Sequence, residues 1–425
     1  MKNLFLTLFL ALSTGTIFAQ TAREEIHENI RRTGSNYLAY IEPTTALTKA
    51  PAGYEPFYMS HYGRHGSRWL IDKTDYTYVI STLKKANEAG ALTQLGKETL
   101  EKMERFYPTS IDRLGDLTTV GERQHHGIAK RMVQNFPEIF SGDAQIDARS
   151  TVVIRCILSM EAECEELAAF NPKIKFHNDV SQAFQYYLNQ PWDGKVAESG
   201  KKGSKERNHY RDKFTQPERL CKSLFADQKY VYNNIDAKTF MYRLFDFVTN
   251  MQSHDTDINL FNLFTEDECY DQWKIRNIEW YISFGPSPIT DGNMPYSQRN
   301  LMKNFIETAD TILSKPKYNG ATMRFGHEVC VMPMACLMEL DSCARQVNDL
   351  ETLDQKWVNY RIFPMAANIQ LIFYRPKKGN GDILVKALLN EKETTLPVQT
   401  DKAPYYKWKD LRAYYLNKLE KFEKE

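Results

Sequence analysis

Apolar and polar residues alternate over short runs near both ends of the chain, and these runs predict β-strands. The runs lie at 57–62, 144–148, 173–179, 321–327, 367–377 and 382–398. Longer stretches, in which apolar residues recur every three or four positions, predict helices at 75–90, 94–107, 120–135, 149–170 and 328–340. Because helices follow strands repeatedly, the pattern predicts an α/β fold in which helices flank a central mixed sheet.

The pattern changes between residues 180 and 317, where aromatic, asparagine and charged residues are frequent and strand-like runs stop. The stretches 237–251 and 296–313 have helical spacing. We therefore expect residues 180–317 to form an inserted, mainly helical cap subdomain. The α/β domain would then comprise residues 20–179 and 318–425.

The first 19 residues have the pattern of a secretory signal peptide. Lys2 precedes an apolar run from Leu4 to Leu12, and small residues lead to a cleavage site after Ala19. No later apolar run approaches the roughly 18 residues of a membrane span. We expect the protein to be exported, either to a periplasm or out of the cell, without a membrane anchor.

The 425 residues carry a net charge of +1, so the overall charge favours neither nucleic acid nor an anionic membrane surface as a partner. Seven cysteines are an odd number and match no zinc-binding spacing, and we interpret them as core residues. The expected partner is a small molecule, and we expect a monomer rather than an oligomer. Any binding site for an anion must be a local feature.

Charged residues collect at three junctions where a predicted strand meets a predicted helix: GRHGSR (63–68), DARSTVVIR (147–155) and RFGHEV (324–329). In α/β sheets, ligands bind at the carboxyl ends of strands, where these junctions lie. The clustering of Arg64, His65 and Arg68 costs energy unless an anion sits beside them. The alternative for this segment alone is a solvated basic turn.

Four segments resemble the motifs of the histidine acid phosphatase family, branch 2 of the histidine phosphatase superfamily. They are GRHGSR, LTTVGERQHHGIAKRM (117–132), ARSTVVIRCILSM (148–160) and GHE (326–328), and they occur in the family's order. The resemblance spans most of the mature chain and is closest in character to multiple inositol polyphosphate phosphatases and phytases. It implies a histidine phosphatase fold, similar to phosphoglycerate mutase, with a helical insertion.

The resemblance also implies which residues form the site. His65 is the expected nucleophile that forms a phosphohistidine, and Glu328 is the expected proton donor to the leaving group. The phosphate would be bound by Arg64, Arg68, Arg149 and His327. Because guanidinium groups neutralise a phosphate through paired hydrogen bonds, we expect neither a metal nor another cofactor.

Other polar residues near these motifs have less specific interpretations. Arg155 is interpreted as structural, and His61 as either a core residue or a cleft residue. His125 and His126 are interpreted as partly exposed helix residues. Glu328 directly follows His327, where most of the family has Asp, and its extra methylene shifts the carboxyl group by about 1.5 Å.

The substrate is less well specified than the chemistry. Residues 199–211 contain five lysines and arginines that could line a cleft for a polyanion or form a solvated basic loop. Together with the Glu in the acid position, they favour inositol polyphosphates such as phytate. One alternative is a broad-specificity acid phosphatase acting on sugar or nucleotide monophosphates. A further alternative is a non-catalytic protein that binds phosphate esters.

Overall fold

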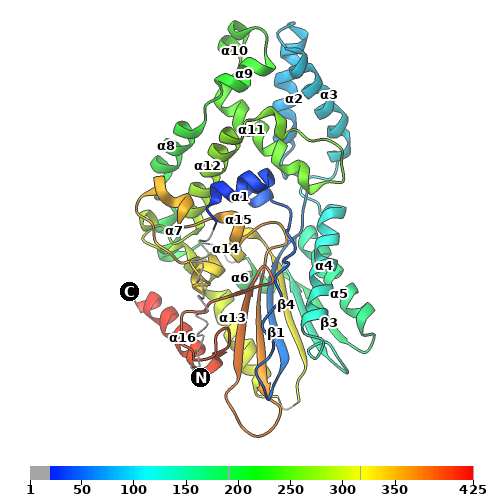
Figure 1. The fold of residues 1–425 in the computed structure, drawn as a ribbon, viewed down its shortest axis with the longest axis vertical. Helices are drawn as coiled ribbons and strands as arrows, with labels where there is room; N and C mark the ends of the chain where they lie inside the picture. The colour runs from blue at the N-terminus through cyan, green and yellow to red at the C-terminus, as the bar shows by residue number, and fades with distance from the viewer. Residues whose placement is uncertain (1–19, 190–191, 316, 425) are drawn as a thin grey trace, which may run out of the picture.

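The structure, a computed structural model, describes residues 20–189, 192–315 and 317–424. The signal peptide predicted for residues 1–19 lies outside the described residues. Within the described part, eight strands form one mixed sheet, in the order β3-β2-β4-β1-β5-β6-β7, and β8 pairs with β6 (Figure 1). The strands are β1 Tyr54–Arg64, β2 Gln145–Ser150, β3 Lys175–Val180, β4 Gly320–Gly326, β5 Asn368–Pro376, β6 Leu384–Leu389, β7 Lys392–Thr394 and β8 Tyr406–Lys407.

The four strands from β3 to β1 are parallel, whereas β5, β6 and β7 continue the sheet in antiparallel pairs. The central strand β1 is buried from Phe57 to Arg64, and its successive side chains point to opposite faces. Tyr58 packs with one hydrophobic cluster and Met59 with another. The predicted α/β fold with a central mixed sheet is therefore confirmed.

Helices cover both faces of the sheet (Figure 1). Apolar residues of α4 and α5 pack with Met59 on one face, and apolar residues of α13, α14 and α16 pack with Tyr58 on the other. No helix within the described residues is long and apolar enough to cross a membrane. The helices are α1 Ala22–Glu28, α2 Lys73–Glu88, α3 Gln94–Phe106, α4 Thr119–Asn135, α5 Ile154–Phe170, α6 Gln185–Leu188, α7 Gly194–Gly200, α8 Ser204–Phe214, α9 Glu218–Leu224, α10 Gln228–Asn234, α11 Ala237–Asn250, α12 Glu266–Phe284, α13 Arg299–Leu313, α14 Glu328–Leu337, α15 Asn359–Ile362 and α16 Trp408–Lys424.

The helices at the top of Figure 1 come from separate segments of the chain, with α2 and α3 beside α9, α10 and α11. Residues of α2 and α3 share a hydrophobic cluster with residues of α9 and α11. The sequence pattern places α2 and α3 in the α/β domain and α13 in the insertion 180–317. In the structure, α13 packs against the sheet. The apolar face of a helix decides which layer it packs in, and the position of the helix along the chain does not show this.

One helix begins later than its apolar pattern predicts. We expected a helix over 149–170, but α5 starts at Ile154. Thr151, Val152 and Val153 are β-branched, and such residues lose side-chain freedom in a helix and favour extended backbone. Arg149 therefore lies in strand β2 rather than at the start of a helix.

Helix α4 approaches the turn after β1 closely enough to require two glycines. A Cβ added at Gly66 would lie 2.5 Å from the carbonyl oxygen of Gly121, and one added at Gly121 would lie 2.3 Å from that of Ser67. The Thr118 side chain caps the helix and also donates to the Ser67 carbonyl at 3.0 Å. The turn and the helix are thus packed backbone to backbone.

This contact predicts opposite effects for two glycines of the same helix. Gly127→Ala should stabilise the protein by up to about 1 kcal/mol through helix propensity, since the nearest atom to its Cβ is the flexible end of Arg131 at 3.1 Å. Gly121→Ala should destabilise it by about 1–3 kcal/mol, because the new Cβ meets rigid backbone. Urea unfolding of both variants measures the difference, and equal effects would contradict the close approach.

Candidate active site

The parallel strands β1 and β4 bring two predicted site histidines together. Arg64, the last residue of β1, lies opposite Gly326, the last residue of β4. His65 and His327 therefore follow side by side, with ring centroids 5.8 Å apart. This is the carboxyl end of adjacent parallel strands, where α/β sheets bind their ligands.

Glu328 lies at the centre of a compact charged cluster. Its Oε2 is 3.2 Å from Nε of Arg64 and 3.3 Å from Nε2 of His65, and its Oε1 is 3.9 Å from Nη2 of Arg68. The structure thus brings together five of the six residues proposed from the sequence, including His327.

The arginines of this cluster carry buried hydrogen-bond donors without partners. Nη2 of Arg64, Nε of Arg68 and Nε of Arg155 have no hydrogen-bond partner, and Nε of Arg64 faces the Glu328 carboxylate at 3.2 Å without hydrogen-bond geometry. Leaving a buried charged donor unsatisfied is expensive, so native proteins do so chiefly where a ligand completes the bonds. Several guanidinium donors around one point suit an oxyanion.

Main-chain carbonyls hold the two arginines of the turn in place. Nη1 of Arg64 donates to the carbonyl oxygens of Asn36 and Phe363, at 2.8 Å and 2.9 Å. Nη1 of Arg68 donates to the Trp69 carbonyl at 2.9 Å. Because these bonds do not depend on a ligand, the guanidinium groups are oriented before an anion arrives, which lowers the cost of binding it.

The environment of His65 favours a neutral, nucleophilic imidazole. Nδ1 lies 2.9 Å from the carbonyl oxygen of Gly66, which can only accept, so Nδ1 carries the proton and Nε2 keeps its lone pair. Burial lowers the pKa of His65 well below its ordinary value; Glu328 opposes this shift, and Arg64 and Arg155 reinforce it. The His65 ring is therefore uncharged at neutral pH, and the lone pair on its Nε2 can act as a nucleophile.

Glu328 is ionised in the free site. Burial alone would raise the pKa of its carboxyl group, but the guanidinium groups of Arg64 and Arg68 hold it well below its ordinary value. It is also the first residue of α14, where the positive end of the helix dipole favours a carboxylate. An anion that binds the same arginines weakens this stabilisation, so Glu328 gains a proton most readily when the site is filled.

His327 is also neutral. Burial lowers its pKa to about 4, with Glu328 opposing this shift and the nearby arginines reinforcing it. Its Nε2 lies 3.2 Å from the hydroxyl oxygen of Thr151. A neutral imidazole at this position can donate one hydrogen bond to a bound anion without adding a further charge.

The structure does not bring Arg149 into this cluster. Its guanidinium group pairs with Asp147 at 2.8 Å, donates to the His177 carbonyl at 2.7 Å and lies 5.2 Å from the Phe184 ring. Arg155, in the first turn of α5, acts electrostatically on His65, and its Nε is buried without a hydrogen-bond partner. The β-branched residues before Ile154 are the sequence signal that would have identified Arg155, because they delay the helix.

The ligand atoms of His65, His327 and Glu328 lie within 4.8 Å of one another, a spacing that also suits a metal ion. The positive charges of Arg64, Arg68 and Arg155 all act on His327, one of these three residues. A divalent cation would be repelled by all three. The donor set therefore favours an anion over a metal.

The basic segment 199–211 contributes little free charge near the site. Lys201, Lys202 and Arg211 are ion-paired with Glu198, Asp291 and Glu279, respectively. Arg211 lines a hollow of about 600 Å³, together with Tyr37, Lys238 and Arg243 and the carboxylates of Asp75, Asp212 and Asp246.

This hollow adjoins the charged cluster through Tyr37. The Tyr37 ring lies 5.5 Å from the guanidinium carbon of Arg68 and so connects the two regions. Arg243 pairs with Asp75 at 2.8 Å, and Lys238 pairs with Asp212. The cations that line the hollow therefore carry counter-charges already.

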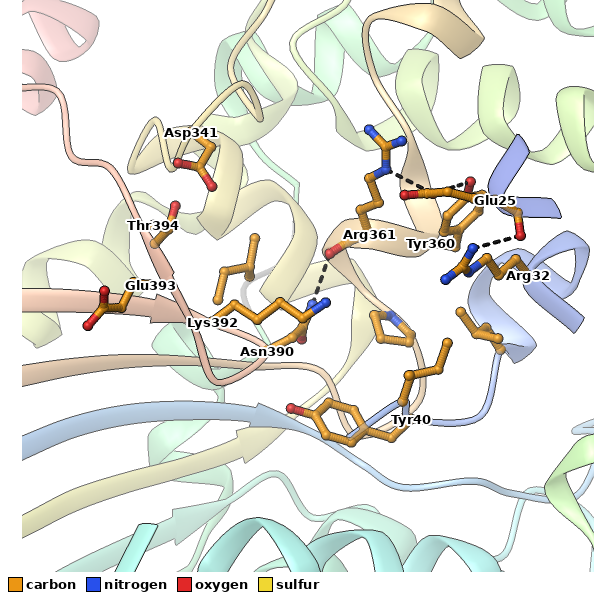
Figure 2. A pocket seen from close by; sticks show the side chains of 14 residues that line it. Glu25, Arg32, Tyr40, Asp341, Tyr360, Arg361, Asn390, Lys392, Glu393 and Thr394 are labelled. Carbon is orange, nitrogen blue, oxygen red and sulfur yellow. Dashed lines mark hydrogen bonds and ion pairs between the residues drawn. The ribbon is translucent and has the colours of Figure 1, made fainter. Parts of the chain in front are cut away.

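A second hollow, of about 280 Å³, lies between the N-terminal helix, the segment around Tyr360 and the end of β6 (Figure 2). Its charged side chains satisfy one another: Arg361 pairs with Glu25 at 3.1 Å, and Tyr360 donates to the same carboxylate at 2.7 Å. None of the residues around His65 lines it. This hollow lacks the unsatisfied cationic donors of the charged cluster.

Comparison with known proteins agrees with this geometry. The family model of the histidine phosphatase superfamily (branch 2) matches residues 63–390. Multiple inositol polyphosphate phosphatase 1 of Gallus gallus is 20% identical over 404 residues, which cover 89% of this chain and 86% of that protein. The resemblance inferred from the four motifs is confirmed.

Solved structures show the same fold. The multiple inositol polyphosphate phosphatase of Bifidobacterium longum, in complex with inositol hexasulfate, has a TM-score of 0.68 at 18% identity and covers 90% of this chain and 97% of its own. The phytase from D. castellii has a TM-score of 0.70 at 15% identity and covers 92% of this chain and 86% of its own. At these identities the similarity establishes the fold.

The positions of the two arginines give a matched test. Arg155→Ala should lower kcat/KM for a phosphomonoester about 10²-fold or more, because it removes a donor from the charged cluster. Arg149→Ala, one strand away and paired with Asp147, should change it only a few-fold. Steady-state kinetics of both variants measures the difference, and a larger loss in Arg149→Ala would restore that residue to the phosphate site.

Proposed function

Since the chain belongs to the histidine phosphatase superfamily (branch 2), we propose that it hydrolyses phosphomonoesters through a phosphohistidine formed on His65. The observation that carries this proposal is the set of buried donors without hydrogen-bond partners on Arg64, Arg68 and Arg155, whose charges act on His65 and His327. These donors complement the equatorial oxygens of a phosphoryl group. The nucleophile lies where such a group would be bound.

The proposed reaction has two steps. In the first, Nε2 of His65 bonds to phosphorus while the ester P–O bond breaks, and Glu328 gives a proton to the departing oxygen. In the second, Glu328 removes a proton from water, the water oxygen bonds to phosphorus, and the P–N bond breaks to release inorganic phosphate. The arginines stabilise the charge on the transferring group in both steps, with His327 as a further donor.

We propose inositol polyphosphates such as phytate as the substrates. The relatives named as multiple inositol polyphosphate phosphatases and phytase support this choice. So does the hollow of about 600 Å³ beside Arg68, which has room for a ring and offers Arg211, Lys238 and Arg243 to further phosphates. Their existing ion pairs favour the alternative, a broad-specificity phosphatase on sugar or nucleotide monophosphates.

Export belongs to the same proposal and rests on the signal-peptide pattern of residues 1–19. An exported protein with seven cysteines must keep its thiols from pairing at random. All seven are free and buried, as expected for core residues. We propose a monomer whose partner is a small phosphomonoester.

Phosphate release from phytate and from a small aryl phosphate tests the proposal. Wild-type protein, assayed between about pH 3 and about pH 8, should release phosphate from both and faster from phytate. His65→Ala should lose turnover on both substrates while unfolding at an unchanged urea concentration.

The outcomes separate the alternatives. Faster release from the aryl ester would favour the broad-specificity enzyme. Binding of both esters without turnover by the wild type would establish a non-catalytic binding protein, and activity retained in His65→Ala would contradict the covalent mechanism.

A further inference from the structure

A second buried group of titratable residues lies behind the turn that carries His65. It consists of His61 on β1, His125 on α4 and Glu163 on α5, whose side chains are fully buried. Nδ1 of His125 lies 2.7 Å from Oε1 of Glu163. We had expected His125 to be partly exposed; instead it faces the sheet, while its neighbour His126 is 32% exposed.

His125 lies beside the main chain of the turn. The main chain of Arg64 is the backbone group that raises the pKa of the His125 ring through hydrogen bonding. Nε2 of His125 has no partner at good hydrogen-bond geometry, and neither has Oε2 of Glu163. Nδ1 is engaged by Glu163, so Nε2 is the ring atom available to the carbonyl.

Both members of the pair are held in their neutral forms. Burial raises the pKa of Glu163 well above its ordinary value; Glu391 adds to this, and Arg131 and His126 oppose it. Burial lowers the pKa of His125 to about 3, helped by His126. The Arg131 guanidinium is itself paired with Glu391 at 2.8 Å, which weakens its effect on Glu163.

Neutral groups hold the rest of the turn. Gly66 N–H donates to the Ser159 hydroxyl at 3.1 Å, and Ser67 N–H donates to the Gln124 side chain at 2.9 Å. The Arg68 carbonyl accepts from Asn250 at 3.1 Å. Gly121, Gln124 and His125 are three or four residues apart and lie on one face of α4. Gly121 and Gln124 of this face contact the turn at Gly66 and Ser67.

We propose that His125 is a positioning residue for phosphoryl transfer. The carboxyl O–H of Glu163 donates to Nδ1 of His125, which places the ring proton on Nε2 and directs it at the Arg64 carbonyl. This inference rests on the proposed function, because it concerns the nucleophile of that reaction.

The peptide between Arg64 and His65 explains how such a contact reaches the nucleophile. The Arg64 carbonyl and the His65 N–H belong to one planar unit. His65 N–H donates to the Gly326 carbonyl at 2.9 Å, and Arg64 N–H donates to the Ala367 carbonyl at 2.7 Å. A hydrogen bond from His125 to the Arg64 carbonyl would fix the remaining group of that plane and so hold the orientation of the His65 ring. A displacement of about 1 Å there costs on the order of 10²-fold in rate.

A purely structural role for the pair predicts different behaviour. Replacing a buried polar pair with apolar groups of the same shape is often neutral or stabilising. A variant that keeps the fold but loses the donor therefore separates the two roles. Gln at position 163 keeps a donor for Nδ1, whereas Met has a similar volume and none.

The test compares Glu163→Gln, Glu163→Met and the control His126→Ala. We expect His126→Ala and Glu163→Gln to keep kcat within about 3-fold of wild type, and Glu163→Met to lose about 10²-fold in kcat while it remains folded by circular dichroism. Wild-type kcat in folded Glu163→Met, or equal losses in the Gln and Met variants, would overturn the inference.

Histidine ¹⁵N NMR gives a readout that does not need turnover. In wild type and Glu163→Gln, His125 should show an unprotonated Nδ1 and a protonated Nε2, assigned against His125→Phe. Protonated Nδ1 in the wild type would overturn the inference. A wild type without turnover would count against the proposed function, and the ¹⁵N signature would still decide the placement of the His125 proton.

Discussion

Buried positive charge without enough counter-charge is the constraint on which this structure depends. Arg64 and Arg68 are at most 2% exposed, Arg155 adds a third cation, and the carboxylate of Glu328 acts on all three. Burial and neighbouring charge lower the pKa of Arg64 to about 10, which measures how unfavourable the arrangement is. A phosphate dianion would supply the missing negative charge. The arrangement therefore favours ligand binding and lowers the stability of the protein without its ligand.

The rest of the fold holds this arrangement in place. Parallel strands β1 and β4 set His65 beside His327, the Gly66–Gly121 contact fixes the turn against α4, and carbonyls of the 363–367 segment orient Arg64. These are short contacts to rigid backbone, so the guanidinium groups need little reorganisation when an anion binds. Glu328 has two roles in this account. It stabilises the arginines in the free site and becomes the acid once an anion displaces it.

Much of this was predictable from local sequence pattern. Strands at 57–62 and 321–327 and the motif around His65 located five site residues, because those residues lie within a few positions of two strand ends. Arg149 pairs with Asp147 and Arg155 acts on His65, which helical periodicity does not reveal because it does not show that Thr151, Val152 and Val153 stay extended. The pairing of His125 with Glu163 joins two helices 38 residues apart, and no local pattern indicates which face of α4 meets the turn. The ion pairs of Lys202 with Asp291 and of Arg211 with Glu279 depend on tertiary contacts in the same way.

The measurement that most directly tests the competition between Glu328 and an anion is calorimetry of sulfate binding. Sulfate does not titrate at about pH 5, where titrations in two buffers of different protonation enthalpy reveal proton uptake. The free carboxyl has a depressed pKa and the filled site raises it, so affinity should increase as pH falls between these two values. Wild type should take up a proton with sulfate, whereas Glu328→Gln should bind sulfate more tightly and take up none. Equal affinity in the two proteins, with no proton uptake in either, would contradict the account.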